Sequence, residues 1–116
     1  MLENKEIAYA IGAFIEIYSS NRNCVPWSQS NDCPFDVEYA SKIKVEEDTL
    51  KTSSTDPELW EFEASATIRF KEKEGSSIPV DAQREIKGRA IIKEINNSIN
   101  QVLPDVEQVL ITNYKY

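Results

Sequence analysis

The sequence contains no histidine. Histidine is the commonest general acid–base group near neutral pH and the commonest zinc ligand, so the usual forms of both kinds of site are excluded. The two cysteines, Cys24 and Cys33, are too few for a zinc site, and their spacing does not form a Cys-x-x-Cys redox motif. We therefore expect no catalytic residues, no metal ion and no cofactor. We expect both thiols to be free, with a disulfide between them as the alternative.

Long apolar runs and an excess of basic charge are also missing. The most apolar stretch, residues 7–18, is interrupted by Glu16 and is too short to cross a bilayer. The first residues carry acids where a secretion signal has positive charge. Lysines and arginines number 13 against 20 aspartates and glutamates, a formal net charge of -7, which argues against generic nucleic-acid or membrane binding. We expect a cytoplasmic protein with neither kind of partner.

The clearest positive feature is a strict alternation between residues 60 and 70. Apolar side chains hold the even positions and polar ones the odd positions: Trp60, Phe62, Ala64, Ala66, Ile68 and Phe70 against Glu61, Glu63, Ser65, Thr67 and Arg69. A period of two is typical of a β-strand with one buried face and one solvent face. Similar patterns predict a first strand over residues 35–49 and a third over residues 83–92.

The remaining elements follow from helical periodicity. Residues 3–19 form a predicted helix with a core-facing stripe, made by Ile7, Ile11, Phe14, Ile15 and Tyr18 and widened by Ala10 and Ile17. Residues 82–103 cannot form one helix, because their apolar positions would fall on opposite sides. We expect the third strand to end near residue 92 and a second helix to begin at Lys93, with Ile95, Ile99, Val102 and Leu103 inward and Pro104 ending it. A last strand covers residues 106–114.

The predicted fold is therefore a single α+β domain over residues 1–116, with the element order α-β-β-β-α-β. Its length is that of one domain with a real core. We expect a four-stranded, mainly antiparallel sheet with both helices packed on one face. The alternation limits pairing of the second and third strands to same-face partners. One such register sets Ile68 opposite Gly88, Ala66 opposite Ala90, Phe70 opposite Ile86, Arg69 opposite Lys87 and Thr67 opposite Arg89.

Negative charge is concentrated in residues 32–63, where ten acids stand against three lysines. The plain interpretation is a solvated surface that keeps the protein soluble. The functional interpretation is an acidic docking face for a basic partner protein, since complementary charge raises the association rate and selects the partner. We predict a non-catalytic binding protein of the inhibitor, immunity or adaptor type, and a homodimer is left open. The predicted partner-binding residues are Asp36, Glu38, Glu46, Glu47, Asp48 and Trp27.

An alternative site lies on the solvent face of the second and third strands. In the register above, like charges would face each other, and this costs stability unless an anion lies between them. The residues concerned, Arg69, Lys87, Arg89 and Thr67, would then bind a small phosphorylated or nucleotide ligand. No glycine-rich phosphate loop accompanies them.

A third alternative is enzymatic. Glu85 and Lys87 would share a strand face, and with Glu61 or Glu63 they could hold Mg²⁺ beside a phosphoryl group. The predicted element order resembles the core of the restriction-endonuclease-like nucleases, which implies a metal-dependent nuclease. The chain departs from that family, because the second strand carries no aspartate and the Pro-Asp element is absent.

Overall fold

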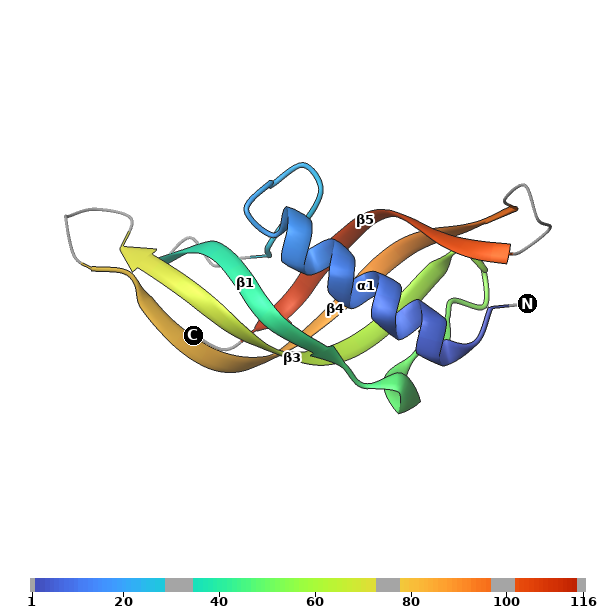
Figure 1. The fold of residues 1–116 in the computed structure, drawn as a ribbon, viewed down its shortest axis with the longest axis horizontal. Coiled ribbons are helices and arrows are strands. Elements are labelled where there is room, and N and C mark those ends of the chain that lie inside the picture. Colours follow the sequence, from blue (N-terminus) through green and yellow to red (C-terminus); the bar gives the residue numbers. More distant parts are fainter. Residues whose placement is uncertain (1, 29–34, 73–77, 97–101, 115–116) are drawn as a thin grey trace.

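The computed structural model describes residues 2–28, 35–72, 78–96 and 102–114. Its elements are α1 (Asn4–Tyr18), β1 (Phe35–Val45), the 3-10 turn η1 (Glu47–Thr49), β2 (Lys51–Thr52), β3 (Leu59–Glu72), β4 (Val80–Asn96) and β5 (Val102–Tyr114). The long strands form an antiparallel sheet in the order β1-β3-β4-β5, and β2 pairs with β3. The sheet curls behind α1, which lies across its buried face (Figure 1). The α+β class is confirmed. No helix in the described parts of the chain is long and apolar enough to cross a membrane.

The first helix forms where its periodicity predicts it. Ile7, Ile11 and Ile15 recur every four residues and are completely buried against the sheet. Phe14 is only half-buried, and Tyr18 is largely exposed, so these two residues border the core-facing stripe. A 15-residue helix is about 22 Å long, whereas the molecule extends over 52 Å. The helix therefore covers only the middle of the sheet.

The alternation in β3 and β4 is also confirmed. The even positions of β3 from Phe62 to Phe70 are buried, and its odd positions are more exposed. In β4, Ile86, Ala90 and Ile92 are buried while Lys87 and Arg89 are exposed. Residues 83–92 therefore form a strand, as the conflict between helical faces predicted.

The prediction of a second helix from Lys93 is wrong. β4 continues to Asn96, and β5 already begins at Val102. Antiparallel pairing with β5 supplies the backbone hydrogen bonds there, and the β-branched residues Ile91, Ile92 and Ile95 suit a strand. Ile92 is buried and Ile95 is exposed, so these two residues lie on opposite faces of β4 and their three-residue spacing does not mark a helix.

Three further details of that helix are corrected. Ile95 is exposed, Val102 and Leu103 are half-buried in β5, and Ile99 lies outside the described residues. Pro104 lies within β5, opposite Glu94, instead of ending a helix. A proline is tolerated there because β5 is an edge strand and needs no donor on its outer side. The two-helix layer is thus replaced by one helix on a longer sheet. The first strand is also shorter than predicted, because residues 47–49 form η1.

The predicted β3–β4 register is displaced by six residues. Gly88 lies opposite Phe62 instead of Ile68, and Ile86 lies opposite Ala64. A displacement by an even number leaves every side chain on its predicted face, so the burial pattern agrees with both registers. Gly88 still lies opposite a bulky side chain, but that side chain is Phe62. A Cβ atom there would lie within 3 Å of the Phe62 ring and of the Leu110 carbonyl oxygen.

Side chains from α1 and the following turn cover the outer edge of β1. The Ser19 hydroxyl bonds both backbone groups of Ala40, accepting from the N–H at 2.9 Å and donating to the carbonyl at 3.2 Å. Arg22 donates to the Val37 carbonyl, and Glu16 accepts from the Lys42 N–H at 2.9 Å. Unpaired strand edges invite further strands, so these bonds close this edge to strand addition.

At the opposite edge of the sheet, residues 24–28 cover the stretch of β5 from Val109 to Ile111. The Val109 N–H donates to the Cys24 carbonyl at 3.1 Å, and the Ile111 N–H donates to the Pro26 carbonyl at 3.0 Å. Trp27 forms a parallel bridge with Ile111. The segment after α1 therefore serves as a short extra strand along β5.

Candidate functional site

The bases on the solvent face of the sheet are neutralised by acids from neighbouring strands. The observed register brings together five pairs: Arg89 with Glu61 at 3.8 Å, Lys87 with Glu63 at 3.4 Å, Arg69 with Asp81 at 2.7 Å, Lys71 with Glu38 at 4.0 Å, and Lys93 with Glu107 at 3.4 Å. Thr67 lies opposite Gln83. The predicted like-charge pairs, Arg69 with Lys87 among them, do not form. Repulsion between facing bases therefore does not favour a phosphate ligand at these residues.

The strongest of these pairs joins Arg69 and Asp81. Arg69 Nε lies 2.7 Å from Oδ1 and Nη2 lies 3.1 Å from Oδ2, which is a two-point contact. The hydrogen bond from Arg69 lowers the pKa of the Asp81 carboxyl, and the same bond raises the pKa of Arg69. The guanidinium also lies 5.0 Å from the centre of the Tyr39 ring. Arg69 is thus already satisfied from two sides.

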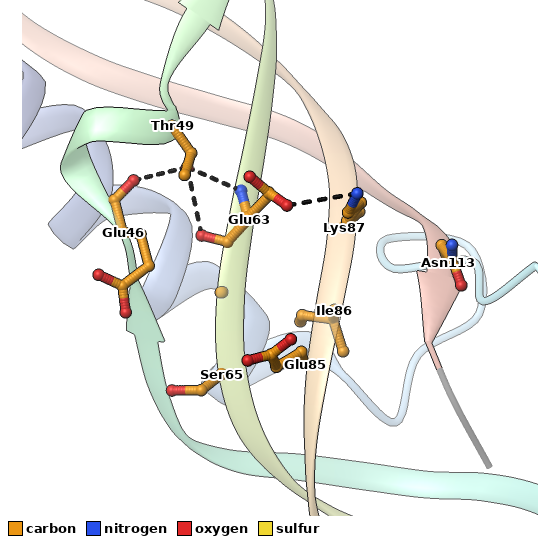
Figure 2. Close-up of a pocket in the computed structure, with 9 residues that line it drawn as sticks. Glu46, Thr49, Glu63, Ser65, Glu85, Ile86, Lys87 and Asn113 are labelled. Atoms are coloured by element: carbon orange, nitrogen blue, oxygen red, sulfur yellow. Dashed lines mark hydrogen bonds and ion pairs between the residues drawn. The ribbon is translucent and has the colours of Figure 1, made fainter.

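A hollow of about 240 Å³ opens on the solvent face beside the end of β1. Its lining residues are Glu46, Thr49, Glu63, Ala64, Ser65, Glu85, Ile86, Lys87 and Asn113 (Figure 2). Thr49 Oγ1 donates to the Glu46 carbonyl at 2.6 Å and accepts from the Glu63 N–H at 2.9 Å. These bonds fix the end of β1 against β3.

The hollow does not assemble the predicted nuclease site. Glu63 contacts Lys87, and Glu61 contacts Arg89, so both candidate partners of Glu85 already have cations. Glu85 itself lies opposite Ser65. Within the described residues, no group of three or more acidic or cysteine side chains is placed to hold a metal ion. The element order that suggested the nuclease family is absent as well.

The acidic segment divides into two parts in the structure. The acids on β1 and β3 lie beside bases: Asp36 pairs in register with Lys71, Glu38 contacts the same lysine, and Glu61 and Glu63 form the ion pairs above. Glu46, Glu47 and Asp48 differ, because they are exposed on and beside η1 and have no ion-pair partner among the described residues. We refer to these three residues as the η1 acidic cluster.

Trp27, predicted to contact a partner, lies in the core. It is 7% exposed, its indole N–H donates to the Ser19 carbonyl at 3.2 Å, and its ring meets Tyr114 edge-on at 5.5 Å. The Trp27 side chain is therefore covered by the protein's own residues in this structure. In the same segment Cys24 is a free, half-buried thiol, while Cys33 lies outside the described residues.

The structure exposes an apolar surface on α1, and it corrects the prediction that Ile17 widens the core-facing stripe. Tyr9 and Ile17 are 80% and 68% exposed on the side of α1 that faces away from the sheet, with Ala13 between them. We refer to Tyr9, Ala13 and Ile17 as the outer face of α1. The sequence indicates this exposed apolar face, because residues 7–18 contain only one charged residue. Apolar side chains therefore lie all round the helix.

Comparisons with known proteins add no relative. No protein-family model matches the sequence, and neither a curated protein nor a solved structure is significantly similar to it. A function must therefore be argued from two surface features, the η1 acidic cluster and the outer face of α1.

Proposed function

We propose that the protein is a non-catalytic binding protein that engages a basic partner protein through its acidic segment, with the η1 acidic cluster at the centre of the contact. An inhibitor, an immunity protein or an adaptor would all act in this way. A cytoplasmic location is part of the proposal and agrees with the free thiol of Cys24.

One observation supports this proposal most. Five acids of the sheet are each paired with a base, whereas Glu46, Glu47 and Asp48 carry three adjacent charges without a described partner. Adjacent like charges repel, so their concentration on one short turn is not explained by folding stability. Complementary charge on a partner would remove the repulsion and speed association. The acids of the ion pairs, in contrast, are explained by the sheet itself.

The test begins with identification of the partner. Immobilised protein would capture partners from its native cells, and mass spectrometry would identify those released by salt. Association rates would then be measured for the wild type and for the triple variant Glu46→Lys, Glu47→Lys, Asp48→Lys. Between roughly 50 and 300 mM salt the Debye length falls about twofold, so we expect slower association and a weaker salt dependence in the variant.

A matched control separates local from global charge. The triple variant Glu72→Lys, Glu94→Lys, Asp105→Lys changes the net charge equally, at acids that do not line the hollow beside Glu46 and have no ion pair among the described residues. We expect it to retain most of the association rate. Equal losses in both variants, or no loss in either, would contradict the proposal that the η1 acidic cluster is the docking site.

A further inference from the structure

We propose that the outer face of α1 and the η1 acidic cluster together bind a cationic amphipathic helix of the partner protein. This inference rests on the proposed function and names the chemistry of the partner. The apolar side of the partner's helix would contact Tyr9 and Ile17. The lysines or arginines of that helix would contact the carboxylates of the η1 acidic cluster.

The apolar half of this surface is a straight ridge on a fixed helix. Tyr9, Ala13 and Ile17 follow one another at intervals of four residues, which is the spacing of the ridges that helices interlock. Ile7, Ile11 and Ile15 anchor the opposite side of α1 with complete burial. The ridge is therefore preformed, and a partner would not need to order it. Tyrosine is enriched at binding hot spots, because it combines a large apolar ring with a hydroxyl.

Phe14 and Tyr18 lie between this ridge and the core-facing stripe, and their ring centres are 4.7 Å apart. Phe14 packs against the core. Phe14 is half-buried, and Tyr18 is exposed. An apolar helix side of this kind is ordinarily buried, so its exposure here indicates an interaction surface.

Acidic side chains lie at the N-terminal end of the same surface. Glu3 and Glu6 are exposed at the start of α1. The η1 turn contacts α1 and lies beside the N-terminal half of the helix, as Figure 1 shows. Lys5 is the single base of this helix. This charge arrangement selects a cationic partner. It disfavours a second copy of the chain, because two copies, each with a net charge of -7, would repel each other.

The middle of β1 and the stretch of β5 around Ile111 are already bonded, which favours a helical partner over a strand at these places. Ser19, Arg22 and Glu16 occupy backbone groups along β1, and residues 24–28 occupy those of β5 around Ile111. A partner strand adding at either of these places would have to displace existing bonds. An exposed helix ridge instead accepts the grooves of another helix without such a loss.

The experiment uses two synthetic peptides of leucine and lysine, each about 18 residues or five helical turns long. One places leucine on a single helix face, and the other has the same composition in shuffled order. Binding to labelled peptide would be measured by fluorescence anisotropy at low salt. We expect the wild type to bind the amphipathic peptide at least about tenfold more tightly than the shuffled one.

Two double variants locate the contact. Tyr9→Ala with Ile17→Ala should weaken binding of the amphipathic peptide about tenfold or more. Ile78→Ala with Val80→Ala is the matched control, because these residues are 87% and 59% exposed near the distant β3–β4 connection. The control should bind like the wild type. Reversal of the η1 acidic cluster should weaken binding of both peptides. Circular dichroism would verify that each variant is folded.

Each other outcome overturns the inference in a distinguishable way. Equal binding of both peptides, unaffected at Tyr9 and Ile17, would leave the acidic docking proposal standing and remove the helix face. Binding of neither peptide would reject the cationic-helix partner, while the association rates of the captured partner would still test the acidic cluster. Sedimentation showing a dimer that Ile17→Ala dissociates would assign the outer face of α1 to a second copy.

Discussion

Replacement of Gly88 by alanine tests the observed β3–β4 register most directly. Gly88 is buried in β4, with Phe62 opposite it in β3 and Ile111 opposite it in β5. A Cβ atom at this position would lie 2.7 Å from the Leu110 carbonyl oxygen and 2.8 Å from Cζ of Phe62. Both separations are shorter than van der Waals contact. In the register predicted from sequence, Phe62 would not lie opposite Gly88 at all.

The size of the effect follows from which neighbour can move. Overpacking of a core costs about 1–3 kcal/mol. The Phe62 ring could shift, but the Leu110 carbonyl belongs to the backbone of β5, so its movement would disturb the pairing with β4. Alanine would recover roughly 0.5–1 kcal/mol of backbone entropy relative to glycine. We expect a net loss of about 2 kcal/mol in the free energy of unfolding.

The assay is urea unfolding followed by circular dichroism, with the free energy taken from the midpoint and slope. Gly12→Ala is the control, because a Cβ atom there would meet Ile43 at 3.8 Å, an ordinary contact, in the middle of α1. Alanine favours the helix over glycine by about 1 kcal/mol, so this variant should be more stable than the wild type. The reasoning would be refuted if Gly88→Ala were as stable as the wild type, or if both alanine variants shifted in the same direction.

Three further predictions concern single interactions. Ser19→Ala should lower the free energy of unfolding by about 2 kcal/mol in urea titrations. Ser19 is 1% exposed, and its loss leaves both backbone groups of Ala40 without their hydrogen-bond partner. An unchanged urea midpoint would show that water replaces the hydroxyl. Lys42 has a φ of 52° in the bulge of β1, so Lys42→Gly should raise the thermal midpoint through a gain of about 1 kcal/mol, whereas Lys44→Gly, outside the left-handed region, should not. Carbon-detected NMR titration should place the pKa of the Asp81 carboxyl below that of ordinary aspartates and move it upward in Arg69→Gln. Because the pKa of Asp81 is lowered in the folded state, its stabilisation of the fold is present above the pKa of the unfolded carboxyl. This stabilisation is lost as the pH falls through the folded pKa. The variant Asp81→Asn should therefore show a shallower loss of stability in acid.

The faces of the elements were determined by the sequence alone. The four-residue spacing of Ile7, Ile11 and Ile15 and the alternation from Trp60 to Phe70 each place side chains relative to their own backbone. Such patterns are local, because a helix or strand repeats its geometry every few residues wherever it lies. The single α+β domain, the first helix and the strand character of residues 83–92 could all be predicted for this reason.

The partners of those faces were decided by the tertiary structure. A strand displaced by six residues keeps the same side chains buried, so alternation could not distinguish Phe62 from Ile68 as the neighbour of Gly88. The same displacement decides which charges meet. It pairs Arg69 with Asp81 and Lys87 with Glu63, and it leaves Glu46, Glu47 and Asp48 without a described base. Likewise, residues 93–96 are strand because β5 lies beside them, a contact between distant segments that no local period records. Charge and propensity are properties of single residues, but neutralisation and pairing depend on what the fold brings within a few ångströms.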